Sequence, residues 1–169
     1  MSSDESLAAP RPQGDYVPAV VVPYAPGLRL VTSAGMTPRR DGVLTVTGLV
    51  GHEVDPATAR DAAALAARNA VAAVASAAVA SASGRPAAGG RELVRAWLRM
   101  TVYVACVDGV TGLSAIADGA SATLASLTPD VPLPARSAIG VRALPGGAPV
   151  EIELTALVAG DERPGTENR

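Results

Sequence analysis

The sequence predicts an α+β domain in which two helices cover one face of a mixed β-sheet. Short runs with an apolar residue at every second position alternate with two longer segments of helical pattern, in the order ββαβαββ. The connections between them are short enough to place both helices on the same face of the sheet. The opposite face is then left uncovered and needs a partner.

The length and composition predict one domain that gains stability from association. With 169 residues the chain can bury a single core. We expect that domain to span residues 16–159, between a disordered polar arm at 1–15 and a disordered tail at 160–169. One Trp, three Tyr and no Phe leave little area to bury per side chain, which favours an oligomer.

The charge pattern and the termini exclude several partners. The net charge is −2 and the arginines are scattered, which argues against nucleic acid. No apolar run approaches the roughly twenty residues that span a bilayer, and residues 1–14 do not resemble a secretory signal. The single cysteine, Cys106, forms no internal disulfide. We therefore expect a cytoplasmic protein without membrane or nucleic-acid partners.

The missing residue types limit the chemistry. The chain has no lysine, so Schiff-base, pyridoxal phosphate and Walker-type chemistry is excluded within it. One histidine and one cysteine cannot build a His- or Cys-rich metal cage, and His52 lies in a stretch typical of an exposed loop. We expect neither metal nor cofactor, so any catalysis has to use carboxylates, hydroxyls, arginines, backbone groups and water.

The first half of the chain predicts two strands and one long helix. We expect strands at residues 28–33 and 43–50, with an Asp-Gly turn before the second. Asp55 and Pro56 supply an N-cap and a proline at the first helical position. Because alanine has the highest helix propensity, we expect the alanine-rich helix that follows to continue to about Ala82.

The middle of the chain predicts a loop, a long strand and a second helix. Residues 83–91 carry Gly, Pro and Gly-Gly and predict a flexible loop. Residues 94–107 alternate in polarity, and Cys106 falls on the apolar side, as expected for a packed core thiol. Residues 113–127 repeat apolar residues at helical spacing. Gly119 costs that helix about 1 kcal/mol relative to alanine, so a packing or functional reason is expected there.

One side of the strand at 94–107 is mixed in character. It carries Arg95, Trp97 and Arg99. No cluster of aromatic residues accompanies the tryptophan, so a nucleic-acid platform is not indicated. We interpret this side as packing against a partner subunit.

Two further strands close the chain, at residues 136–143 and 150–159. If their apolar faces lie against the helices, Arg136 and Glu151 both project from the open face. Arg136 is then either a carboxylate-binding residue or a structural residue paired with Glu151 or Glu153. Glu151 in turn either orients a water molecule or is only a salt-bridge partner.

This last third carries a recognisable pattern. Pro134-Ala135-Arg136-Ser137, then Leu144-Pro145, then Val150-Glu151-Ile152-Glu153, resembles the Rid (YjgF) family of imine and enamine deaminases. Weaker matches follow in order: Pro23-Tyr24-Ala25-Pro26-Gly27 for the tyrosine-bearing loop, Val31-Thr32-Ser33 for the first strand, Arg68-Asn69 in the first helix and Thr101-Val102-Tyr103-Val104 in the central strand.

The resemblance covers residues 15–159 and implies a chorismate-mutase-like fold. It implies a homotrimer whose sheets form a central barrel, with a site in each cleft between subunits. In such a site Arg136 binds the carboxylate of a small imino or oxo acid, and Glu151 positions the water that attacks the C=N carbon. Tyr24 and Ser33 line the same pocket. The implied reaction converts 2-imino or enamine acids, such as 2-iminobutanoate, to 2-oxo acids and ammonia.

The sequence departs from the family at the pocket. The stretch from Asp118 to Leu124 contains no asparagine, whereas deaminating members usually carry one near the middle of this helix, and Ala138 stands where cysteine is frequent. By correspondence we expect Asp118, Gly119 and Ala138 to contact the ligand. The departures leave three hypotheses: an imine deaminase, a Rid-fold enzyme recruited to a biosynthetic tailoring step on another carbonyl or imine substrate, and a non-catalytic trimer that binds a small acid.

Overall fold

The computed structural model describes residues 11–82 and 90–160. Its main elements are β1 (Ala19–Ala25), β2 (Leu28–Ser33), α1 (Pro56–Ser81), β5 (Val94–Ala105), α2 (Leu113–Leu127), β6 (Ala135–Val141) and β7 (Val150–Ala159). Two short strands, β3 (Arg39–Arg40) and β4 (Val43–Leu44), precede α1, and the 3-10 turns η1 (Arg91–Leu93) and η2 (Pro145–Gly147) precede β5 and β7. Most of the predicted arm, loop and tail lies outside the described residues, so those three expectations stay predictions.

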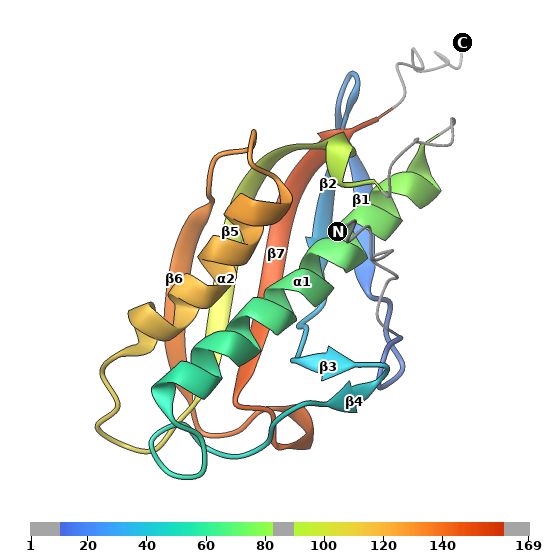
Figure 1. Cartoon of the computed structure of the whole chain (residues 1–169). Coiled ribbons are helices and arrows are strands. Elements are labelled where there is room, and N and C mark those ends of the chain that lie inside the picture. Colours follow the sequence, from blue (N-terminus) through green and yellow to red (C-terminus); the bar gives the residue numbers. More distant parts are fainter. Residues whose placement is uncertain (1–10, 83–89, 161–169) are drawn as a thin grey trace, which may run out of the picture.

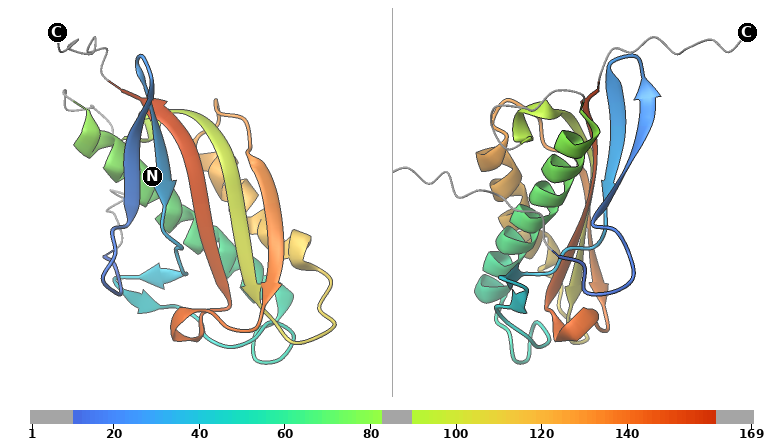
Figure 2. Two further views of the ribbon diagram at one scale, coloured as in Figure 1. Left: turned by 180° about the vertical axis from the view of Figure 1, so that it is seen from behind. Right: turned by 90° about the vertical axis from the view of Figure 1, so that its right-hand side faces the viewer.

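The five long strands form one mixed sheet in the order β1-β2-β7-β5-β6. Neighbouring strands run antiparallel except β5 and β6, which are parallel. Both helices lie on one face of this sheet, as Figure 1 and Figure 2 show, and the other face is open. The α+β class, the mixed sheet and the single helix-covered face are therefore confirmed.

Two strands differ from the sequence prediction. The sequence does not predict β1, because Pro23 interrupts its valine run; the proline is tolerated because β1 is an edge strand. The strand expected at 43–50 shrinks to its first two residues, which pair with β3. Asp41 and Gly42 have φ of 52° and 81°, which confirms the Asp-Gly turn. Gly48, at φ 122°, lies in the irregular segment that follows β4.

The long helix α1 begins where the sequence predicts. The Asp55 carboxylate accepts hydrogen bonds from the backbone N–H groups of Ala57 and Thr58 at 2.9 and 3.0 Å. Asn69 donates from Nδ2 to two backbone carbonyls around β3, both at 3.0 Å. The asparagine matched by family resemblance thus ties α1 to the small hairpin.

The apolar character of α1 reflects burial in the protein core. By length and composition α1 could cross a membrane, contrary to the expectation that no apolar run was long enough. Most of that stretch is buried inside the protein, where its alanines pack in the same core as the buried sheet residues. It is therefore a core helix. Its small side chains are the reason the sequence shows no conventional amphipathic stripe.

Two register shifts in β5 change the faces predicted for that strand. They fall within residues 94–99, where β5 pairs with β7. Trp97 consequently lies on the helix side: it is buried, and its Nε1 donates to Oγ1 of Thr128, the C-cap of α2, at 2.9 Å. Leu98 is exposed instead. The prediction that Trp97 faces a partner subunit is therefore wrong. Arg99 is exposed and remains available for such a contact.

The two helices approach closely at Gly119. A Cβ atom at this position would overlap the backbone carbonyl oxygen of Arg60 on α1. The packing reason expected for a glycine in α2 is thereby identified. The same contact means that Gly119 supports the helix pair. Its assignment as a ligand-binding residue stays a prediction.

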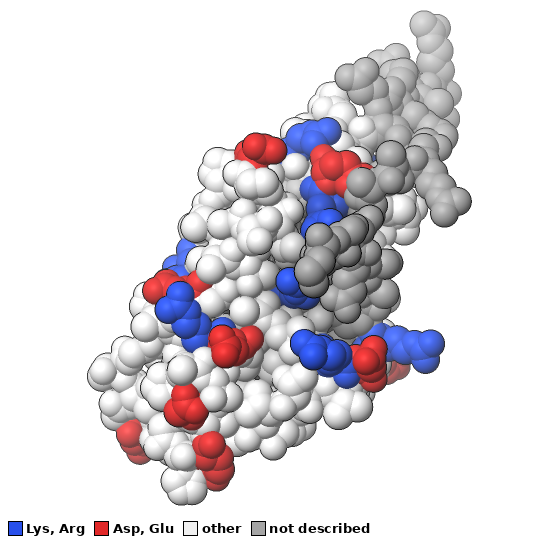
Figure 3. All heavy atoms as spheres, in the orientation of Figure 1, with Lys and Arg blue, Asp and Glu red and all other residues white. Residues whose placement is uncertain are grey.

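Arginines and acidic residues are interspersed over the helix-covered side of the molecule. Figure 3 shows the two kinds of side chain next to one another on this face. Nucleic-acid-binding surfaces instead gather basic side chains in a patch or stripe. The visible face therefore has the charge pattern of an ordinary solvated surface.

Candidate functional site

Arg136 lies on the helix side of the sheet. It is the second residue of β6 and pairs with Met100 of β5, whose side chain is fully buried. Because cross-strand partners share a face, the Arg136 side chain is directed toward α2 and is only 19 % exposed. The prediction that Arg136 projects from the open face is wrong. The apolar residue Ile139 is the reason, because it occupies the open face instead and is 42 % exposed.

Four donated hydrogen bonds hold the Arg136 guanidinium along α2. Nη1 donates to Asp118 Oδ1 at 2.9 Å and to Ser121 Oγ at 2.7 Å. Nη2 donates to the Oγ and the carbonyl oxygen of Ser114 at 2.9 and 3.3 Å. Ser114, Asp118 and Ser121 are separated by four and three residues, so they occupy one face of the helix. The guanidinium is fixed in orientation and carries an ion pair with Asp118.

Glu151 lies on the open face of the sheet. It follows the buried start of β7 and pairs with Tyr103 of β5. Its carboxylate lies against Gly35, where a Cβ atom would overlap it. Burial raises the pKa of Glu151, and the neighbouring Glu153 carboxylate raises it further. Glu151 is therefore more easily protonated than an ordinary surface glutamate.

Other polar groups surround Glu151 on the open face. The Tyr103 hydroxyl donates to Glu153 Oε2 at 3.1 Å, and burial, followed by Glu153, raises the pKa of Tyr103. Arg99 Nη2 donates to Ser137 Oγ at 2.7 Å. These five residues, Arg99, Tyr103, Ser137, Glu151 and Glu153, are called the open-face cluster below.

Arg136 and Glu151 consequently lie on opposite faces of one sheet. A single chain cannot present both groups to the same small molecule. The alternative that Arg136 pairs with Glu151 or Glu153 is also wrong, because its acidic partner is Asp118. Any site that uses both residues needs two copies of the chain.

The remaining predicted site residues are distributed over both sides. Tyr24 belongs to strand β1, beside a register shift, and is 62 % exposed, so it is not in a loop. Ser33 is buried, and its Oγ accepts a hydrogen bond from the backbone N–H of Leu154 at 3.0 Å. Ser33 therefore joins β2 to β7, and its assignment as a pocket residue stays a prediction. Ala138 packs against the core two residues after Arg136.

Four residues of the site region are not predicted by the sequence. Ser114 and Ser121 could have been found, because they share the helical spacing of Asp118. Tyr103 and Gly35 could not, because their contacts with the glutamates depend on strand register and on a chain crossing. Helical spacing in the sequence therefore predicts the neighbours of Arg136 more readily than any local pattern predicts the neighbours of Glu151.

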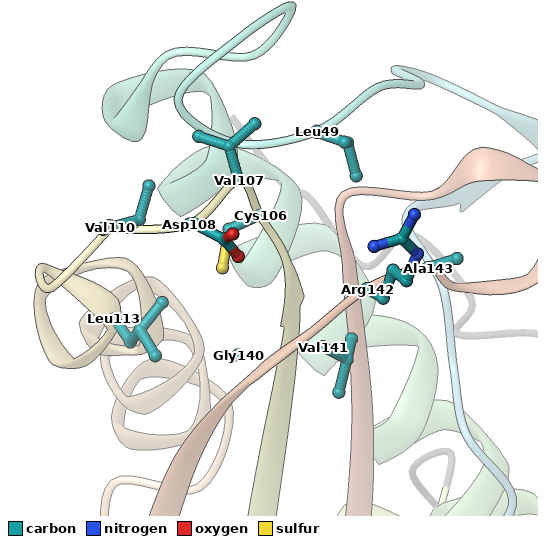
Figure 4. Close-up of a pocket in the computed structure, with 11 residues that line it drawn as sticks. Leu49, Cys106, Val107, Asp108, Val110, Leu113, Gly140, Val141, Arg142 and Ala143 are labelled. Atoms are coloured by element: carbon teal, nitrogen blue, oxygen red, sulfur yellow. The ribbon is translucent and has the colours of Figure 1, made fainter.

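A separate groove of about 1010 Å³ lies near the C-terminal end of β6. Figure 4 shows Cys106, Val110 and Leu113 on one side of it and Arg142 on the other. None of the predicted ligand-binding residues lines this groove. Cys106 packs against the core but is only half-buried, so the expectation of a core thiol is met in part.

The described residues place no group of metal ligands. Within residues 11–82 and 90–160, no three His, Cys, Asp or Glu side chains are close enough together to hold a metal ion. His52 is 70 % exposed and its Nδ1 contacts Glu53 at 2.7 Å. The prediction of an exposed loop histidine is confirmed.

Known proteins share this architecture. The family model described as Endoribonuclease L-PSP matches residues 6–158. A protein of unknown function from Agrobacterium tumefaciens is 30 % identical, with 90 % of this chain and 84 % of that chain covered and a TM-score of 0.72. A putative endoribonuclease from Shewanella oneidensis is 19 % identical, with coverage of 90 % and 91 % and a TM-score of 0.75. Escherichia coli TdcF with bound serine is 22 % identical, with coverage of 92 % and 97 % and a TM-score of 0.57.

The comparisons identify the family. No curated protein matches the chain. The five-stranded mixed sheet with two helices on one face defines an α+β protein with the YjgF-like fold. The chain belongs to the endoribonuclease L-PSP family, which is also called the YjgF or Rid family. The family resemblance read from the sequence is confirmed.

Proposed function

We propose that the chain is a cytoplasmic imine or enamine deaminase whose site forms between the subunits of a homotrimer. One observation carries the proposal: a guanidinium held in place on the helix side accompanies a carboxylate of raised pKa on the open face. The two groups supply carboxylate binding and proton transfer, which the reaction requires. Membership of the Rid family supports the same assignment.

Arg136 binds the substrate carboxylate. A planar guanidinium forms charge-assisted, bidentate hydrogen bonds with a carboxylate. The hydrogen bonds with Ser114 and Ser121 fix the direction in which the guanidinium faces. Asp118 is accessible, with 53 % of its side chain exposed, so a ligand meets Arg136 and Asp118 together.

Glu151 activates the water. As the water oxygen adds to the C=N carbon, Glu151 accepts a proton from the water, and the imine nitrogen takes up a proton from solvent. Glu151 then returns its proton to the amino nitrogen of the resulting carbinolamine. The C–N bond breaks, the C=O bond forms as the hydroxyl proton passes to solvent, and ammonia leaves. A carboxylate whose pKa is raised is a stronger base than an ordinary glutamate and therefore suits this transfer.

Association of three chains brings the two halves together. The outer edge of β6, near Arg136, and the open face, with Glu151, belong to different surfaces of the chain. Exposed apolar side chains on β1, at Val20, Val22 and Tyr24, support burial against another subunit. The chain has few aromatic residues in its own core, which makes such burial valuable for stability.

A second candidate function is a trimer that binds a small acid without turnover. Arg136 already donates four hydrogen bonds to α2, so a ligand has to share or displace these contacts. This observation favours binding without turnover. In this case the cleft captures a 2-oxo acid, and Glu151 serves only in subunit packing.

The test is turnover of freshly generated 2-iminobutanoate, followed by loss of the imine and release of 2-oxobutanoate. Wild-type protein is expected to accelerate the decay, and Arg136→Ala to lower kcat/KM by about 100-fold or more, because charge-assisted hydrogen bonds are lost. Arg142→Ala is the matched control, since Arg142 borders the separate groove. Binding of 2-oxobutanoate without any turnover by the wild type would reject the deaminase in favour of the second candidate.

A further inference from the structure

We infer that Asp118 makes the Arg136 site selective for ligands that carry a positively charged nitrogen beside their carboxylate. Such ligands are protonated 2-imino acids, whose iminium nitrogen is bonded to the carbon next to the carboxylate, and α-amino acids in their zwitterionic form. The inference deepens the proposed function, because it rests on Arg136 as the carboxylate-binding group. It concerns which charge state of the substrate is bound.

The guanidinium is already neutralised within the chain. Asp118 Oδ1 lies 2.9 Å from Arg136 Nη1. The other two side chains bound to Arg136, Ser114 and Ser121, are uncharged. The pair therefore presents one positive and one negative group side by side, with no net charge.

The Asp118 carboxylate is placed to receive a ligand. Only Oδ1 is engaged with Arg136, while the side chain is 53 % exposed. By contrast the Arg136 side chain is only 19 % exposed, and its Nη1 lies 2.9 Å from Asp118 Oδ1. A ligand that reaches the guanidinium therefore comes close to the aspartate as well.

The charge of the pair discriminates between ligands. A simple monoanion such as a 2-oxo acid is attracted by Arg136 and repelled by Asp118 at a similar distance. A zwitterion places its carboxylate on Arg136 and its cationic nitrogen on Asp118, so both charges are paired. Asn at the same position would not repel the monoanion.

This selectivity has a chemical consequence for the deaminase. A protonated C=N bond is more electrophilic than a neutral one, and a nearby carboxylate stabilises the protonated form. Hydrolysis converts the zwitterionic iminium acid to a monoanionic oxo acid. Asp118 therefore favours binding of the reactive substrate and release of the product from the same cleft.

The test compares two stable probes, L-2-aminobutanoate as the zwitterion and 2-oxobutanoate as the monoanion. Their Kd values are measured by calorimetry for wild type and Asp118→Asn, at one pH and ionic strength. Wild type is expected to prefer the zwitterion. Asp118→Asn is expected to weaken zwitterion binding by about tenfold and to strengthen monoanion binding by a similar factor, because one charge contact is removed.

Asp130→Asn serves as the matched control. It changes the net charge by the same amount at an exposed residue beyond α2, outside the contacts of Arg136. It is expected to leave the ratio of the two Kd values unchanged. An equal ratio in wild type and Asp118→Asn, or no binding of either probe to wild type, overturns the inference.

The turnover assay separates this inference from the proposed function. A shifted Kd ratio without imine turnover in wild type keeps the role of Asp118 and rejects the deaminase. Turnover that depends on Arg136, with an unshifted ratio, keeps the deaminase and rejects the role of Asp118. Melting temperatures of the variants establish that each compared protein is folded.

Discussion

The two regions that carry the candidate site differ in how their charged groups are paired. On the α2–β6 edge, Arg136 has an acidic partner and hydroxyl acceptors from its own chain. On the open face, Glu151 lies beside a second carboxylate, Glu153, and burial raises its pKa. The charge of Arg136 is therefore paired within one chain, whereas the carboxylate of Glu151 has a like charge, Glu153, beside it.

The difference indicates how a site can be divided between identical chains. The Arg136 guanidinium is held by its own chain before any ligand or partner arrives. The open-face cluster, by contrast, would be stabilised by a partner that brings positive charge or hydrogen-bond donors. An interface between the α2–β6 edge of one chain and the open face of another therefore adds partners to Glu151 and leaves the hydrogen bonds of Arg136 unchanged. Three experiments test whether the two regions act together in one site.

The largest effect is expected from mixing two inactive variants. Arg136→Ala lacks the guanidinium of the first region, and Glu151→Gln lacks the carboxylate of the second. If one trimer cleft combines Arg136 of one chain with Glu151 of its neighbour, equal mixing with subunit exchange restores about one quarter of the clefts. Imine turnover by the mixture, compared with each variant alone, is the measurement. A mixture as inactive as its components, despite proven exchange, contradicts the divided site.

A smaller effect is expected from Gly119→Ala, which disturbs the arginine side. The added methyl group overlaps the Arg60 carbonyl oxygen, and a backbone group cannot move aside easily. We expect a loss of about 1–3 kcal/mol in the free energy of unfolding, measured with urea. Gly112→Ala is the control, because a Cβ atom there meets open space. Equal stability of the two variants would show that the helices can separate at no cost.

The smallest effect is expected from Glu151→Gln on stability. Because the folded-state pKa of Glu151 is raised above the ordinary value of 4.5, its contribution to stability is complete below pH 4.5 and is lost as the pH rises through the folded-state pKa. The stability of Glu151→Gln relative to wild type should therefore increase as the pH rises above 4.5, by less than about 1 kcal/mol because solvent partly screens the group.

That comparison requires unfolding curves at several pH values and one fixed protein concentration, because association also affects stability. Thr155→Ala, on the same face of β7, controls for changes that do not remove a carboxylate. A difference between Glu151→Gln and wild type that is constant with pH contradicts the raised pKa.

The general fold could be predicted from the sequence because its local patterns agree. Asp55 and Pro56 mark the start of α1, and the apolar spacing from Leu113 to Leu127 marks α2. β1 escaped prediction because the proline in its valine run is compatible only with an edge strand, and edge position depends on the whole sheet.

The sequence proposes Arg136, Asp118 and Glu151 as site residues, but it assigns Arg136 and Trp97 to the wrong faces of the sheet. In β6 the small residues face α2 and Ile139 faces outward, which reverses the usual relation between polarity and burial. In β5 the register shifts reorder the alternation. Neither effect can be read from polarity alone.

The burial of Trp97 has a practical consequence. It is the only tryptophan of the chain, and its indole N–H is bound to the residue that ends α2. Its emission therefore reports specifically whether the end of this helix is docked on the sheet. Titrations and stopped-flow mixing can follow that docking with no attached dye, and the predominance of one fluorophore keeps the signal easy to interpret.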